Sequence, residues 1–176
     1  MDSFMEKIVA RRKSPAERLK TTGVVFLALI LMAVVLGVLP NIPTVGPFFQ
    51  SVSFFLVAGI GFGTWWLITG QNLEFEYIVT NMDLDIDQIV SQRKRKRVFT
   101  AKAKDFEICA KRNGPNYAEF AKGTFKLLDY SGSPKAPDCW FIITQYKGDR
   151  VMVLFEPDDR MVQNFRRFNP ARVKFD

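Results

Sequence analysis

The fold is decided by an uncharged stretch that reads Thr21-Thr22-Gly23-Val24-Val25-Phe26-Leu27-Ala28-Leu29-Ile30-Leu31-Met32-Ala33-Val34-Val35-Leu36-Gly37-Val38-Leu39 and stops at Pro40. As a helix these 19 residues extend about 28 Å, close to the roughly 30 Å hydrocarbon thickness of a bilayer. The stretch belongs to a longer run, residues 21–73, in which 53 consecutive positions carry no charge. About a quarter of residues are normally charged, so the run predicts insertion into a membrane.

A second apolar run covers residues 48–69 and is also long enough to cross once. Between the two runs, residues 40–47 contain three prolines and a glycine, which forbid a continuous helix. We therefore predict a transmembrane hairpin over residues 21–70, with spans at about 21–39 and 48–69.

The flanking charges predict the orientation of this hairpin. Residues 1–20, interpreted as a separate basic segment, carry six Lys and Arg, whereas the loop at 40–47 carries none. Because Lys and Arg are retained on the cytoplasmic side, both termini should be cytoplasmic in a multi-pass protein of the cell membrane. Cleavage as a signal peptide is not expected, since a signal's apolar core is usually about 7–15 residues long.

Two features of the second run predict contacts. Gly59 and Gly63 form a small-xxx-small pair, which we interpret as packing against the first helix. A homo-oligomer interface or a contact with another membrane protein is the alternative. Trp65 and Trp66 are expected to anchor the helix at the inner headgroup boundary.

Residues 71–176 alternate between apolar and polar residues, which is typical of strands with one buried face. The pattern predicts about seven strands and then a helix, capped by Asp158, whose apolar face carries Met161, Val162, Phe165 and Phe168. The expected fold class is α+β: a two-helix transmembrane hairpin followed by a small antiparallel β-barrel or sandwich with a C-terminal capping helix.

Several segments are similar to bacterial membrane-anchored pleckstrin-homology-like domain proteins. They are Tyr77-Ile78-Val79-Thr80-Asn81 directly after the hairpin, Leu84-Asp85-Ile86, Asp105-Phe106-Glu107-Ile108, and Phe155-Glu156-Pro157-Asp158 with Met161 and Phe165. The resemblance implies a pleckstrin-homology-like β-domain over residues 71–176, held close to the membrane. It implies no catalytic residue.

The strongest charge feature is the run Arg93, Lys94, Arg95, Lys96 and Arg97. No core can hold five cations, so the run should occupy a hairpin end or an exposed edge. One interpretation is a solvated edge that discourages strand pairing, and the other is binding to anionic lipid headgroups or to a partner. Nucleic acid is not expected, because residues 71–176 carry 19 cations and 15 anions, a net charge of only +4.

The missing residue types argue against catalysis. The chain has no His, which removes imidazole bases and His metal ligands, and its two cysteines are interpreted as buried, reduced thiols. Asp83, Asp85 and Asp87 are typical of a solvated strand. We expect no enzyme, cofactor, metal or small-molecule substrate, but a membrane protein with a cytoplasmic binding or scaffolding domain. An accessory subunit of a membrane transport or secretion complex is the first alternative, and a membrane-surface enzyme the second.

Overall fold

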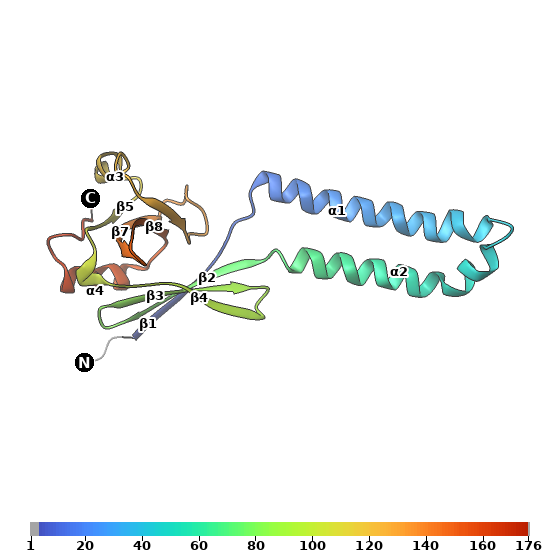
Figure 1. The fold of residues 1–176 in the computed structure, drawn as a ribbon, viewed down its shortest axis with the longest axis horizontal. Coiled ribbons are helices and arrows are strands. Elements are labelled where there is room, and N and C mark those ends of the chain that lie inside the picture. Colours follow the sequence, from blue (N-terminus) through green and yellow to red (C-terminus); the bar gives the residue numbers. More distant parts are fainter. Residues whose placement is uncertain (1–3, 176) are drawn as a thin grey trace. The chain divides into compact units, whose positions relative to one another are not determined.

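The computed structural model describes residues 4–175, which divide into two compact units (Figure 1). One unit is a helical hairpin, residues 13–72. The other is a β-rich lobe formed by residues 4–12 and 73–175.

The hairpin begins at a capping box. The Ser14 hydroxyl accepts the Glu17 backbone N–H at 3.2 Å, and the Glu17 carboxylate accepts the Ser14 N–H at 2.7 Å. This cap starts α1 (Pro15–Ala33) several residues ahead of the predicted span. The chain then continues through a π-helical turn (Val34–Val38) and a 3₁₀ turn (Leu39–Asn41) into α2 (Gly46–Thr69).

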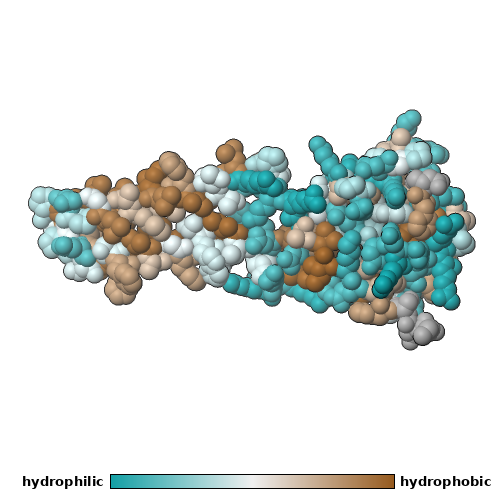
Figure 2. Space-filling model, turned by 180° about the vertical axis from the view of Figure 1, so that it is seen from behind, coloured by the Kyte–Doolittle hydropathy of each residue, from teal (hydrophilic) through white to brown (hydrophobic). Residues whose placement is uncertain are grey.

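Both helices are long and apolar enough to cross a membrane. Within their most apolar 18-residue windows, only 11% of the first and 0% of the second is buried. Figure 2 shows apolar residues over much of the visible face of the hairpin. Because the apolar side chains point outward, these helices do not have the burial expected of core helices of a soluble domain.

The first sheet of the lobe has the strand order β1-β2-β3-β4, and all of its pairs are antiparallel. Its strands are β1 (Phe4–Ala10), β2 (Leu73–Thr80), β3 (Asp83–Val90) and β4 (Lys94–Lys102). β1 differs from our prediction of a separate basic segment at 1–20, because residues 4–10 pair with β2 from Phe4↔Thr80 to Ala10↔Glu74. Its burial alternates as in a strand, but the hairpin separates it in sequence from its partner β2, so no local signal links the two strands.

The second sheet has the order β5-β7-β8-β6. Its strands are β5 (Ile108–Lys111), β6 (Lys126–Asp129), β7 (Trp140–Tyr146) and β8 (Asp149–Phe155). β6 pairs with β8 in parallel, so the prediction of an entirely antiparallel domain is wrong at this strand. The loop at 130–139 carries the chain past β8 before β7 begins, which lets β6 run parallel to β8.

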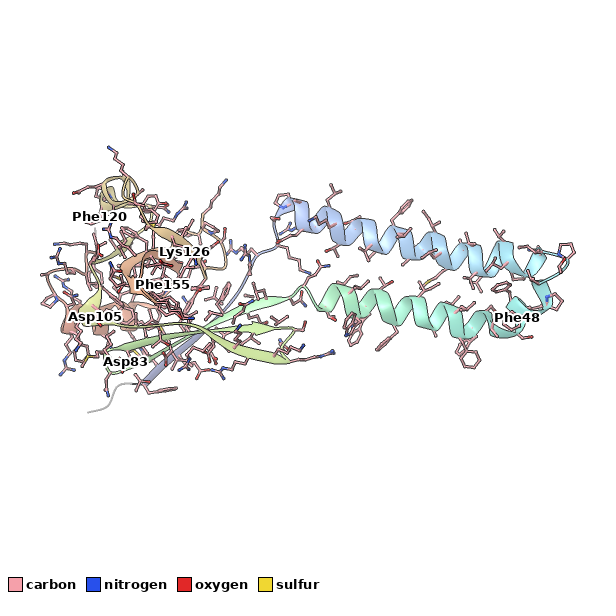
Figure 3. All side chains as sticks on the ribbon, in the orientation of Figure 1. Phe48, Asp83, Asp105, Phe120, Lys126 and Phe155 are labelled. Atoms are coloured by element: carbon pink, nitrogen blue, oxygen red, sulfur yellow. The ribbon has the colours of Figure 1, made fainter. Side chains whose placement is uncertain are left out.

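The prediction of an α+β fold is confirmed, and among residues 4–175 the structure has eight strands rather than seven, the additional one being β1. The two sheets do not join into a closed barrel among the described strands, because β4 and β6 each end a sheet. The sheets instead enclose a common core, in which Phe155 is fully buried (Figure 3).

The polar centre of this core is Tyr77. Its hydroxyl donates to the Tyr130 carbonyl at 2.7 Å and accepts the Glu156 backbone N–H at 3.2 Å, which ties segments of both sheets together. Burial raises the pKa of Tyr77 well above its ordinary value, so the hydroxyl keeps the proton that it donates.

Two helices cover the lobe. α4 (Asp159–Phe168) begins as predicted, with the Asp158 carboxylate accepting the Met161 N–H at 2.7 Å. Met161, Val162 and Phe165 are buried, each contributing about 1.5–3 kcal/mol of apolar burial. α3 (Pro115–Phe120) is a short helix between β5 and β6. It packs on the other face of the second sheet, where Tyr117 meets Phe141 edge to face.

Candidate functional site

The basic run 93–97 starts in the β3–β4 turn and continues along β4, the terminal strand of its sheet. Ser91 and Gln92 both have positive φ, 54° and 57°, and the Arg93 N–H donates to the Val90 carbonyl at 3.1 Å. These features define a two-residue type I′ turn, whose backbone twist matches the twist of the two strands of a hairpin. Along β4 the side chains then alternate between the two faces of the sheet.

The two arginines inside β4 lie on the outer face and bind carboxylates. The Arg95 Nε and the Arg97 Nε each lie 2.8 Å from Asp87, and Arg95 also pairs with Glu76. Glu76 and Asp87 are only 3% and 5% exposed, because the arginines cover them. The interpretation of Asp87 as a solvated strand residue is therefore wrong.

A third carboxylate extends this network. Asp85 accepts the Arg97 Nη1 at 2.7 Å and the Thr100 hydroxyl at 2.7 Å. The hydrogen bond from Asp87, and then the negative charge of Asp85, raise the pKa of Arg97. Arg95 and Arg97 thus serve mainly to neutralise acidic residues of β2 and β3. The sequence did not predict these ion pairs, because only the strand register brings the residues together.

The two lysines of the run lie on the other face. Lys94 pairs in register with Val90, and Lys96 with Gln88, which stands opposite the buried Phe75. Among the described residues no ion pair involves either lysine. The structure therefore divides the part of the run within β4 by face: Arg95 and Arg97 bind carboxylates on the outer face, and Lys94 and Lys96 lie exposed on the other face.

A cleft of about 240 Å³ separates β4 from β6, the terminal strands of the two sheets. It is lined by Val98, Leu128, Tyr130, Tyr146 and Val151, with Lys126, Lys147 and Asp149 adding charge. Lys126 is labelled on β6 in Figure 3. The cleft therefore combines an apolar and aromatic lining with two cations and one anion.

A β-bulge shapes the cleft. The register of β3 with β4 shifts between Ile86 and Asp87, so Val98 is an extra residue in β4. Its carbonyl accepts the Tyr130 hydroxyl at 3.4 Å and the Tyr146 hydroxyl at 3.1 Å. Burial, followed by the neighbouring Tyr146, raises the pKa of Tyr130, so this donor stays protonated at neutral pH.

One end of the first sheet collects the chain segments that lead to the hairpin. The Arg11 N–H donates to the Leu73 carbonyl and the Arg12 N–H to the Gly132 carbonyl, both at 2.8 Å. Since Leu73 pairs with Val90, the β3–β4 turn lies at this same end. Arg11, Arg12, Arg93 and Lys94 consequently belong to one end of the sheet, which we call the entry end.

Close packing holds the entry end together. A Cβ on Gly132 would lie 2.8 Å from the Val9 Cγ1 and 2.9 Å from the Ala10 carbonyl oxygen. Only glycine lets the loop after β6 approach β1 this closely.

In the hairpin, neither Gly59 nor Gly63 has an atom within 4 Å of an added Cβ. Both line an open apolar groove of about 250 Å³ beside α1, whereas a Cβ added to Gly61 would lie 3.5 Å from the Met32 Cε. Trp65 and Trp66 lie near the end of α2 and are 50% and 57% exposed.

Cys109 and Cys139 are free, buried thiols, in agreement with their interpretation from the sequence. Burial is the main cause that raises the pKa of Cys139 to about 11, and it raises that of Cys109 further. The thiolate is the nucleophilic form of cysteine, so neither side chain is suited to nucleophilic chemistry near neutral pH.

Two stacked sheets with a helix following the last strand are the architecture of a pleckstrin-homology-like domain. The chain belongs to the family described as Bacterial PH-like domain (DUF6106), whose model matches residues 1–175. The resemblance noted from the sequence is therefore confirmed. No curated protein and no solved structure matches the chain significantly.

Proposed function

We propose that this protein is a binding or scaffolding module rather than an enzyme, anchored in a membrane by its hairpin. The cations of the entry end contact anionic lipid headgroups on the cytoplasmic side. The observation that carries the proposal is the register of the first sheet, which gathers Arg11, Arg12, Arg93 and Lys94 where the chain leaves for both helices.

The outward-facing apolar surface of the two helices supports the membrane anchor. A removable signal sequence is disfavoured, because β1 precedes α1 in the chain and is paired with β2 after α2. Cleavage would take an edge strand from the sheet. The same pairing favours two crossings, since a strand before the hairpin and a strand after it can share a sheet only on one side of the membrane.

Short linkers support the headgroup contact. Only residues 13–14 separate Arg12 from α1, and only residues 70–72 separate α2 from β2. A chain extends at most about 3.6 Å per residue, so the entry end stays near the helix ends. Each cation near an anionic membrane surface contributes about 1 kcal/mol.

The two ends of β4 provide an internal test. Lys94 and Lys102 are its first and last residues, about 27 Å apart at roughly 3.4 Å per residue, which exceeds the Debye length of about 8 Å at physiological salt. The full chain would be placed in phosphatidylcholine nanodiscs with and without phosphatidylglycerol. Labelling by an amine-reactive ester would then be read by mass spectrometry.

We expect anionic lipid to reduce labelling of Lys94 several-fold, with recovery at high salt, and to leave Lys102 unchanged. Equal labelling of Lys94 in both kinds of disc, or equal protection of Lys102, would contradict headgroup contact through the entry end.

A further inference from the structure

We propose that the cleft between β4 and β6 receives an extended acidic segment of a partner protein, which adds as a strand to the free edge of β6. This interaction is separate from the headgroup contact of the entry end. The inference rests on three features of the cleft: an open strand edge, its charge, and its size.

The open edge follows from the pairing of β6. The Tyr130 N–H donates to the Leu154 carbonyl at 2.9 Å, in line with the parallel register of β6 with β8. Because backbone groups alternate in direction along a strand, those of Leu128 also point to β8, whereas those of Leu127 point away from it. As β6 ends its sheet, the backbone of Leu127 faces the side where a further strand can add.

The facing edge of β4 is less suited to strand addition. Its bulged residue Val98 already offers its carbonyl to the Tyr130 and Tyr146 hydroxyls, so the edge is occupied at its centre. A segment in the cleft would therefore pair with β6 and rest its inward side chains against the tyrosines.

The charge around the cleft selects an acidic segment. Lys126 stands opposite Val151, which belongs to the core between the sheets, so its side chain lies on the cleft side. Lys147 lines the cleft 5.1 Å from the Tyr146 ring, and Lys96 lies on the same face of β4 two residues before Val98. Asp149 offsets one of these three cations. Arg95 and Arg97 do not contribute, because they lie on the opposite face against carboxylates.

The size of the cleft favours side chains of a segment over a whole cofactor. Small-molecule sites usually measure about 300–1,000 Å³, and this cleft measures about 240 Å³. A strand that crosses its mouth needs to place only alternate side chains inside.

The test starts from a displayed library of random peptides, selected against the full chain in phosphatidylcholine nanodiscs. We expect the enriched peptides to be acidic, with polar and β-branched residues alternating. Enrichment of basic or neutral peptides, or of none, would overturn the proposal.

The affinity of an enriched peptide would then be measured on four proteins by fluorescence anisotropy. Lys126→Glu with Lys147→Glu should weaken binding about tenfold or more, equivalent to about 1.4 kcal/mol. Lys111→Glu with Lys174→Glu makes the same change in net charge at β5, the opposite edge of the second sheet, and should leave binding unchanged. Equal losses would show bulk charge attraction in place of a cleft.

Leu127→Pro tests the strand addition itself, because it removes an N–H that does not bond to β8. We expect it to abolish binding while the lysine variants report on charge. If a folded Leu127→Pro protein, judged by its thermal unfolding, binds as well as wild type, strand addition is wrong. If anionic lipid displaces the bound peptide and this displacement requires the same lysines, the cleft is a lipid site and the proposal fails. The labelling of Lys94 tests the entry end independently of this result.

Discussion

Replacing Arg97 tests whether the basic run is chiefly structural. Arg97→Met removes two charge-assisted hydrogen bonds, one to Asp87 and one to Asp85, leaving Asp87 with Arg95 alone. Such bonds are worth about 1.5–3 kcal/mol each when well protected. The Arg97 side chain is 49% exposed, so water compensates for much of the lost hydrogen bonding. We therefore expect the free energy of unfolding to fall by about 1–2 kcal/mol.

Lys96→Met is the matched control, since it removes one positive charge from the neighbouring position on the opposite face. It should change the stability by less than about 0.5 kcal/mol. For a lobe of this size the Arg97 variant should unfold roughly 5–10 °C lower than wild type. Thermal unfolding of the full chains, followed by near-ultraviolet circular dichroism, would measure both. Equal effects of the two variants would refute the assignment of Arg97 to the carboxylate network.

Other substitutions probe packing, buried polar groups and proton linkage. Gly132→Ala should lower the free energy of unfolding, measured in urea, by about 1–3 kcal/mol, because the added Cβ would clash with β1. Gly59→Ala and Gly63→Ala should not lower the melting temperature of the hairpin, because a Cβ at either position meets no atom within 4 Å. Tyr77→Phe should lower the free energy of unfolding by about 1–3 kcal/mol, because it leaves two part-buried backbone groups without their hydroxyl partner, and an unchanged urea midpoint would contradict this. The pKa of Cys139 is about 11 against an ordinary 9.0, so the folded lobe keeps this proton where the unfolded chain loses it, and Cys109 behaves in the same way. Stability should therefore fall as the pH rises from about 9 towards 11. In urea midpoints, Cys139→Ala should reduce that decline by about half and leave the part due to Cys109.

The helices could be predicted from the sequence because their signals are local. An uncharged run of 53 residues interrupted by prolines can form little other than two apolar helices, although the capping box of Ser14 and Glu17, which our prediction of a span from about residue 21 did not use, starts the first helix earlier. Asp158 and the apolar spacing after it likewise specify α4. Such signals need no knowledge of distant residues, because a helix closes its hydrogen bonds within itself.

The pairing of the strands, in contrast, depends on contacts between distant parts of the chain. β1 and β2 are neighbours although more than 60 residues separate them along the chain, and the parallel pairing of β6 depends on the path of a loop. The division of the basic run has the same origin: Arg97 meets Asp87 only through the register of β4 on β3, and the bulge at Val98 opens the cleft. Strand pairing is made between segments remote in sequence, so one-dimensional alternation gives each strand two faces but leaves its neighbours undetermined.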